Sequence, residues 1–420
     1  MDSPKSYHPA TPWLNWVAAT SYLMLGFGFQ TCYAILNRQM AERLSLTPTD
    51  IGIVSSTYTW CFAVGQLLSG ALLDRLGARR ILPKACALLT IGIFCFAWAP
   101  GLISLVIAQV LLAAGASFGF VGAGFMSRMW FSPKRYGIMF SLAQFAVSFF
   151  AFVCQQTLAR GLEGLPYEWV ISGLGLAGLA LFSFMLLCLR DPSGATAAAP
   201  AGSLPALLKS LLRGVGEVLQ TPGVLRIVII GTASFGAMIS LSAVWGPRLL
   251  IAHGLPPDEA GSAVSLGWLG LALGVPFIVW CAQKFNFEKG MIMLGMLVQC
   301  LCISLLLVMH APAAWLCSLL MFFWGAAAGA NLLPFMLAAR CAGEARTGTA
   351  MALVNCGQFI AGGVLVYIPG RLLDVVPGVG ISGALGVLPI SLLAALVLCF
   401  RLKVMTCRLP GEGTPKARSS

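Results

Sequence analysis

Long apolar runs, each about as long as a membrane-spanning helix, follow one another along almost the whole chain of 420 residues. A helix needs roughly 20 predominantly apolar residues to cross the hydrocarbon core of a bilayer. The pattern therefore predicts an all-α membrane protein with about twelve transmembrane helices. The expected spans are 14–36, 50–73, 81–99, 102–125, 138–159, 168–189, 225–250, 259–283, 289–310, 313–337, 347–369 and 380–402.

A longer interval at 190–224 divides these runs into two groups of six. It begins with Arg190-Asp191-Pro192, continues through Ala-, Pro-, Gly- and Ser-rich sequence, and then carries spaced leucines near Lys209 and Arg213. This pattern is typical of a linker ending in a short amphipathic helix at the membrane surface, and an ordinary linker with incidental leucines would also produce it. The predicted organisation is an N-terminal segment at 1–13, a six-helix half at 14–189, the linker at 190–224, a second six-helix half at 225–402 and a tail at 403–420.

The two halves are similar in sequence at a constant offset of 211 residues. Arg135-Tyr136-Gly137 precedes Gln144 in the first half, and Arg346-Thr347-Gly348 precedes Asn355 in the second. Stretches rich in glycine and alanine precede both motifs, and small residues allow close helix contact in lipid. The repetition indicates a duplicated unit, as in transporters with parallel repeats. The expected fold is therefore two pseudo-symmetric six-helix bundles.

The composition agrees with a lipid-facing surface. The chain is 59% hydrophobic and 10% charged, with a mean hydropathy of +0.89, whereas soluble domains are about 25% charged. The formal net charge of +12 lies in short basic clusters between apolar runs, without the interleaved aromatic residues of a nucleic-acid surface. We therefore expect membrane lipid, and no nucleic acid, as a partner.

The distribution of lysine and arginine predicts the orientation. If the N-terminus lies inside, only five of the 26 basic residues fall in the outer loops. This excess is what the positive-inside rule predicts for an even number of spans with both termini cytoplasmic. The first residues carry no signal-peptide pattern, so the first run is expected to be a retained span. We expect a multi-pass protein of a bacterial cytoplasmic (inner) membrane. The outer basic residues are Arg38, Arg43, Arg160, Arg248 and Arg371.

No pattern of catalytic, metal-binding or cofactor-binding residues is visible. The 14 cysteines contain no CxxC pair, and the three histidines (His8, His253 and His310) are far from any plausible nucleophile. There is no phosphate-binding loop, which argues against an ATP-driven transporter as well as an enzyme. We expect no catalytic residue, no metal and no cofactor, and a monomer.

One loop motif points to a family. Between the second and third runs stands Gly70-Ala71-Leu72-Leu73-Asp74-Arg75-Leu76-Gly77-Ala78-Arg79-Arg80. It resembles the GxLxDRxGxRR signature of the major facilitator superfamily, in the loop where that family carries it. The resemblance implies a twelve-helix transporter fold in which this loop helps to close the inner gate against the eleventh helix. The implied gating residues are Gly70, Asp74, Arg75, Gly77, Arg79 and Arg80.

The chemistry of this loop supports a gate and allows a simpler role. Asp74 is an anion at the cytoplasmic boundary, where it can pair with a basic side chain or with the positive end of a neighbouring helix. The alternative is that the charges only set the topology. The corresponding loop of the second half has Gln283 near the position of the aspartate, so a second gate of this kind is doubtful. The fifth span lacks the GxxxGPxxGG-like stretch of drug–proton antiporters, which argues against multidrug efflux.

The substrate site is expected to be uncharged. The middle of every apolar run is free of Asp, Glu, Lys, Arg and His. Because intramembrane charges usually mark transport sites, a strongly anionic substrate and proton coupling through a midplane carboxylate are unexpected. Each candidate amide could instead form a helix–helix hydrogen bond. The candidate lining residues are Tyr22, Gln30, Tyr33, Gln109, Gln144, Trp245, Asn331, Asn355 and Gln358.

These observations predict a secondary transporter that imports a small organic solute by alternating access. A proton or another ion remains a candidate coupling partner. An efflux carrier for amphipathic compounds and a transporter-like sensor are the alternatives.

Overall fold

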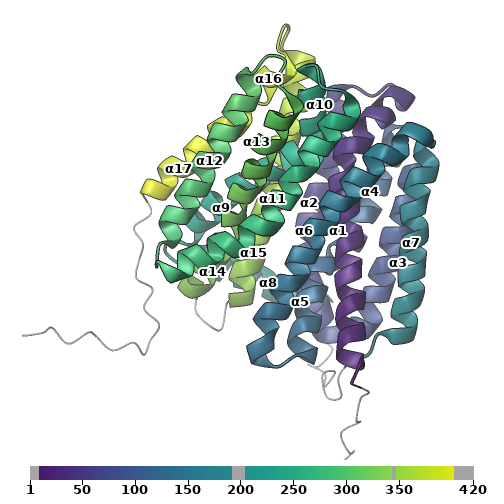
Figure 1. Cartoon of the computed structure of the whole chain (residues 1–420). Helices are drawn as coiled ribbons and strands as arrows, with labels where there is room; N and C mark the ends of the chain where they lie inside the picture. Colours follow the sequence, from purple (N-terminus) through teal and green to yellow (C-terminus); the bar gives the residue numbers. More distant parts are fainter. Residues whose placement is uncertain (1–8, 192–203, 343–346, 402–420) are drawn as a thin grey trace, which may run out of the picture.

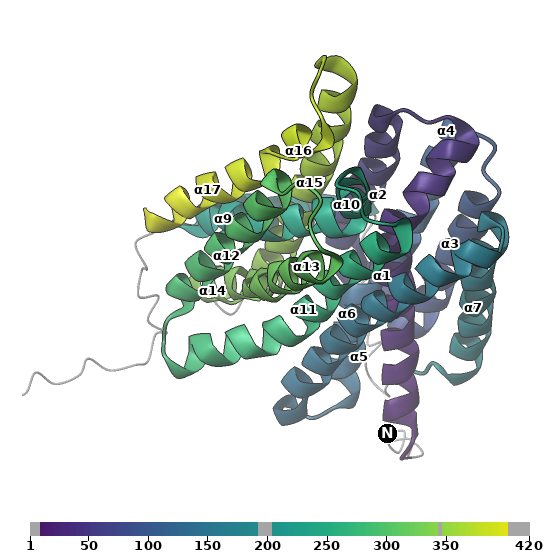
Figure 2. The same ribbon diagram turned by 45° about the horizontal axis from the view of Figure 1, so that its top comes forward.

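The computed structural model describes residues 9–191, 204–342 and 347–401, and this part of the chain is helical and contains no strand. The N-terminal residues 1–8, the linker residues 192–203 and the tail after Arg401 lie outside the described residues. Figures 1 and 2 show an elongated bundle in which the first seven helices stand beside the later ones. We call the end of the bundle where α1 begins the N-terminal face, and the other end the opposite face.

Six spans form the first group. The fourth span is interrupted at Ser117 and so consists of two helices, α4 and α5. The helices are α1 (Thr11–Leu44), α2 (Pro48–Leu76), α3 (Ala78–Ala97), α4 (Leu102–Ala116), α5 (Phe118–Trp130), α6 (Pro133–Gly164) and α7 (Tyr167–Cys188).

The second group contains three interrupted spans. A π-helical segment, η1, breaks the seventh span, a 3₁₀ segment, η2, breaks the tenth, and a bend follows α16 in the twelfth. The elements are α9 (Val224–Ser240), η1 (Leu241–Trp245), α10 (Gly246–Ala252), α11 (Pro257–Lys284), α12 (Glu288–Val308), α13 (Ala314–Ala328), η2 (Gly329–Leu332), α14 (Leu333–Ala342), α15 (Thr347–Val375), α16 (Ile381–Ala384) and α17 (Val387–Phe400).

Eleven helical segments of the described chain are long and apolar enough to cross a membrane. The helix α1, with 34 residues, is long enough to be the twelfth, and it is less apolar because it buries polar side chains such as Asn15 and Asn37 inside the bundle. The prediction of an all-helical membrane protein with about twelve spans is therefore confirmed. Between the groups lies α8 (Leu204–Leu219), at the place where the spaced leucines predicted a short helix. Its Lys209, Leu212 and Arg213 are exposed.

Small residues bring the helices of the second group into close contact. A Cβ atom placed on Gly325 of α13 would collide with the carbonyl oxygen of Gly267 on α11, and one placed on Gly270 would collide with Phe322 O. The backbones of α11 and α13 therefore touch, which is the packing that small residues permit in lipid. Across the boundary between the groups, α2 packs along α15 and α6 packs along α11.

Candidate functional site

A cavity of about 610 Å³ lies between the two groups of helices. It extends from the middle of the bundle to the N-terminal face, because its walls include Ile138 near the start of α6 and Gln283 near the end of α11. Among the described residues that line it, none is charged. Its aromatic lining comprises Phe27, Phe62, Phe120, Phe140, Phe145, Phe235, Trp280, Phe335 and Phe359, and its polar lining comprises Gln66, Gln144, Ser148, Gln283, Asn331, Asn355 and Gln358.

Four of the predicted lining residues meet in this cavity. Gln144 of α6 and Asn355 of α15, which the sequence repeat relates, both line it, as do Asn331 and Gln358. Gln358 Nε2 makes long contacts of 3.5 Å with Gly231 O and 3.4 Å with Asn331 O.

Two amide groups of the cavity lining have buried atoms without a hydrogen-bond partner in the described chain: Nε2 of Gln66 and Oε1 of Gln144. Buried polar atoms are normally paired, so each of these atoms needs a water or a ligand. One is a donor and the other an acceptor, and the cavity can therefore bind a solute group of either kind.

Three other predicted residues lie together in a much smaller space. Gln30, Tyr33 and Gln109 line a cavity of about 10 Å³ beside Tyr58, which is about the volume that one water requires. Tyr33 Oη donates to Ile51 O at 3.2 Å, whereas the Oε1 atoms of Gln30 and Gln109 have no partner in the described chain. This space could hold a bound water but not an organic solute.

The remaining two predicted residues are part of helix–helix contacts. Tyr22 Oη donates to Gly115 O, and Trp245 Nε1 donates to Val366 O at 2.9 Å. Both side chains are almost fully buried, and neither lines the 610 Å³ cavity.

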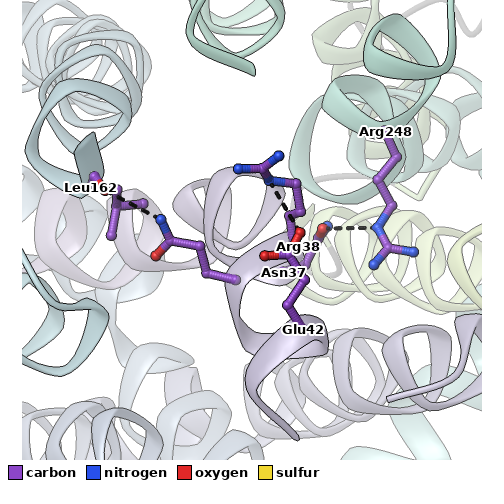
Figure 3. A network of polar contacts seen from close by, with 6 residues as sticks. Asn37, Arg38, Glu42, Leu162 and Arg248 are labelled. Carbon is purple, nitrogen blue, oxygen red and sulfur yellow. Dashed lines mark hydrogen bonds and ion pairs between the residues drawn. The ribbon is translucent and has the colours of Figure 1, made fainter. Parts of the chain in front are cut away.

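The opposite face is closed by hydrogen bonds between the two groups of helices, of which Figure 3 shows the one between Asn37 and Arg248. Asn37 Nδ2 of α1 donates to Val244 O of η1 at 2.6 Å, and Arg248 Nε of α10 donates to Asn37 Oδ1 at 3.3 Å. The N–H of Thr49, at the start of α2, donates to Asp374 Oδ2 at 2.8 Å, so this carboxylate stabilises the positive end of the helix. The bundle is thus tied together at one face and hollow at the other.

Two adjacent glutamines of α6 extend this closed region, and the sequence analysis did not select either. Gln155 Nε2 donates to Thr31 O of α1 and, at 3.2 Å, to Ser242 O of η1. Gln156 Oε1 accepts from Ser262 Oγ at 3.0 Å, and its Nε2 donates to Ser265 Oγ at 3.0 Å. Their only signal in the sequence is that they are consecutive amides inside an apolar run.

The loop motif adopts a tight turn at the N-terminal face. Gly77 separates α2 from α3 with φ of +76°, a left-handed value that favours glycine. The N–H of Arg79, at the start of α3, donates to Asp191 Oδ1 at 3.1 Å, and the side chains of Arg79 and Arg80 are exposed. A Cβ on Gly70 would meet Val121 Cγ1 at an ordinary 3.8 Å. The side chains of Asp74 and Arg75 lie outside the described residues, so their predicted gating role stays a prediction.

Residues 18–366 match the sequence model of the Major Facilitator Superfamily. The chain belongs to this superfamily. Its members are transporters, which confirms the prediction that the protein is a multi-pass membrane transporter and not an enzyme.

The curated relatives of this superfamily chain are distant. It is 28% identical over 386 residues to the inner membrane transport protein YdhP of Escherichia coli strain K12, covering 90% of this chain and 92% of the relative. It is 21% identical over 318 residues to the "Probable galactarate/D-glucarate transporter GudP" of the same strain, covering 68% and 71%. It is 23% identical over 318 residues to the multidrug resistance protein MdtH of Aeromonas hydrophila, covering 74% and 75%.

Solved structures of the superfamily share the fold. The nucleoside transporter NupG superposes with a TM-score of 0.73 at 15% identity, covering 93% of this chain and 98% of that one. The xylose transporter XylE from E. coli, in a partially occluded inward open conformation, gives a TM-score of 0.72 at 13% identity with the same coverage.

Proposed function

We propose that this transporter imports a small, uncharged organic solute with an apolar or aromatic part, by alternating access. The observation that carries the proposal is the cavity between the two halves, whose described lining offers aromatic rings and neutral amides and contains no charged side chain. Its volume of about 610 Å³ falls within the roughly 300–1,000 Å³ range typical of small-molecule sites.

The absence of charge from the lining selects among substrates. An ionised solute entering a cavity in the membrane loses its hydration, and only an opposite charge or several strong hydrogen bonds can compensate for that cost. A doubly charged sugar acid, such as the substrates in the name of the relative GudP, would find no cation among the lining residues that the structure describes. A neutral solute would bind by stacking on the phenylalanines and by bonding to the unpaired amide atoms of Gln66 and Gln144.

The transport cycle follows from the contrast between the two faces. We propose that the N-terminal face is cytoplasmic, as the positive-inside rule predicts, so the described conformation is inward-facing. To bind a solute from outside, the protein must break the bonds that Asn37, Gln155 and Gln156 make across the closed face and rock the two halves. Asp74 would then close the inner face, as the loop motif implies for the family. A bacterial inner membrane, the location in the name of the relative YdhP, is the proposed setting.

Coupling follows from the same lining. Because the described part of the lining contains no carboxylate, we propose facilitated diffusion or exchange as the basic mode. A proton or another ion would have to act through groups outside the cavity.

Efflux is the second candidate, and one observation favours it. Phe145 of α6 and Trp280 of α11 line the cavity and are both exposed, so they offer accessible aromatic rings on which an amphipathic compound could stack. The relative named as a multidrug resistance protein is consistent with this candidate.

Transport assays with matched variants test the proposal. A thermal-shift screen of the purified protein against neutral aromatic and amide-bearing metabolites identifies a ligand, which is then used for uptake into right-side-out vesicles and for loss from loaded ones. We expect Gln144→Ala and Asn355→Ala to reduce uptake roughly tenfold, since each removes a hydrogen bond to the solute of about 1.4 kcal/mol. Gln220→Ala, an exposed amide outside the cavity, is the control and should transport normally.

The outcomes separate the alternatives. Faster loss than uptake under matched gradients would establish efflux. Binding without transport in either direction would establish a sensor. Preferred binding of a dianion would contradict the proposed substrate class.

A further inference from the structure

A second hollow, separate from the central cavity, lies within the second half at the N-terminal face. It has a volume of about 1360 Å³, and it is bordered by the start of α9, the start of α12, the end of α14 and the end of α17. None of its described lining residues belongs to the first half. We call it the α9–α12–α17 groove. It takes no part in the transport cycle proposed above.

The inner wall of this groove is apolar and open to the side of the bundle. Leu294 and Leu297 of α12 line it and are 50% and 53% exposed, and Leu396 of α17 faces them from the other side. The two leucines lie about two turns inside the span Glu288–Val308, so at their depth the surrounding medium is the hydrocarbon of the bilayer. An acyl chain fits such a wall.

The rim of the groove, at the N-terminal face, is basic. Arg226 at the start of α9, Lys289 at the start of α12 and Arg401 after α17 line it. Lys289 Nζ donates to Phe400 O at 3.2 Å, which fixes the ammonium group at the rim. Among the described lining residues the one carboxylate, that of Glu288, is ion-paired with Arg340. The described rim therefore carries three cationic side chains, those of Arg226, Lys289 and Arg401, at the level of the lipid headgroups.

We propose that the α9–α12–α17 groove binds one anionic glycerophospholipid of the leaflet at the N-terminal face. The phosphate would lie among Arg226, Lys289 and Arg401, and one acyl chain would lie along Leu294 and Leu297. Basic pockets between transmembrane helices are suited to anionic headgroups. A soluble anion would leave the apolar wall uncovered. The tail of this chain is a poor competitor, because residues 402–420 contain four basic residues and one acidic residue and would be repelled by the rim.

Lipid titration of the purified full-length protein tests this proposal. Dioleoylphosphatidylglycerol and dioleoylphosphatidylcholine are each titrated into the protein in neutral detergent, and bound lipid is counted by native mass spectrometry. The test variant is Arg226→Gln/Arg401→Gln, since both side chains are exposed and should not affect folding. The matched control is Lys209→Gln/Arg213→Gln on α8, which removes the same charge from exposed positions outside the groove.

The expected result is one tightly retained phosphatidylglycerol, with phosphatidylcholine held much more weakly. Each cation near a membrane surface contributes about 1 kcal/mol, or roughly fivefold in affinity, so the test variant should lose roughly 25-fold and the control should change little. Leu297→Trp, which narrows the groove at its apolar wall, should weaken the binding of phosphatidylglycerol and leave any binding of inorganic phosphate unchanged.

Three results would overturn the proposal. Equal affinity of the wild type and the Arg226→Gln/Arg401→Gln protein would show that the groove is not the site. An equal loss in the α8 control would show a general charge effect. If inorganic phosphate alone raised the thermal midpoint of unfolding as much as phosphatidylglycerol does, the rim would be a site for a soluble anion.

Discussion

Arg248 Nε donates a hydrogen bond to Asn37 Oδ1, and the two residues are 211 positions apart, the same offset that relates Gln144 to Asn355. The contact thus joins equivalent positions of the two halves at the closed face. The related pair Gln144 and Asn355 lines the central cavity. One duplicated unit therefore supplies both the closure at one face and the polar lining of the cavity.

The first prediction concerns this closure. Asn37→Ala removes two hydrogen bonds, with Val244 O and Arg248 Nε, at a cost on the order of 2 kcal/mol. The population open at that face should rise roughly 20- to 30-fold. Ser55 is buried and lines the small cavity beside Tyr33, so we expect faster modification of a Ser55→Cys variant by a membrane-impermeant maleimide, corrected for the native cysteines. Gln39→Ala breaks a bond within the first half only and should leave the rate unchanged. Equal modification rates in the Ser55→Cys protein, with and without Asn37→Ala or Gln39→Ala, would show that other contacts close this face.

The second prediction compares the two glutamines of α6. Gln155 is fully buried, so Gln155→Leu leaves the carbonyls of Thr31 and Ser242 without this donor and should cost about 1–3 kcal/mol of stability. Gln156 is half-buried, and water can replace its bonds. Denaturant unfolding in detergent should therefore show a larger loss for Gln155→Leu than for Gln156→Leu. The reverse order would contradict the role assigned to Gln155.

The third prediction uses two glycines with different surroundings. Gly325→Ala forces a methyl group into the carbonyl oxygen of Gly267, so α11 and α13 must separate and stability should fall by about 2 kcal/mol or more. Gly70→Ala meets only an ordinary contact and should unfold like the wild type. Thermal midpoints of the two purified variants provide the comparison. A stable Gly325→Ala protein would show that these helices can move apart at little cost.

The fourth prediction concerns pH. Burial, and then the positive charge of His310, lower the pKa of His253 below its usual range. The folded state therefore holds fewer protons on this residue than the unfolded state, and stability should fall as the pH drops below about 6.5, the ordinary pKa of histidine. His253→Gln can keep a bond to Ser382 Oγ and should lose part of this pH dependence. The thermal midpoints of the wild type and of His253→Gln at pH 5 and pH 7.5 test this prediction. If the difference between the two pH values is the same in both proteins, His253 is not its cause.

The fifth prediction concerns the loop motif. Asp74→Asn keeps the shape of the side chain and removes its charge, so expression should stay near normal, because one boundary carboxylate contributes little to folding. Transport should fall sharply if Asp74 holds the inner gate. Normal transport in a well-expressed variant would leave only the topological role.

The sequence predicted the spans well, because apolar length alone identifies a helix that crosses a membrane. It also related Gln144 to Asn355, because the repeat carries positional information. It could not separate Trp245, whose N–H is bonded to Val366 O, from residues that line the cavity. It also missed Gln155, because an apolar run has no polar face that would fix the rotation of its helix. Which amide faces a neighbouring carbonyl is decided by tertiary packing.

The π-helical segment Leu241–Trp245 has a consequence for the energetics of opening. Two of its carbonyls, those of Ser242 and Val244, accept from Gln155 and Asn37 of the other half. When the halves part at that face, both carbonyls lose these donors, and the hydrocarbon around the bundle offers no replacement. Only water can then donate hydrogen bonds to these two carbonyls. Opening of the opposite face is therefore a wetting transition, in which water must enter between the two halves as the helices separate.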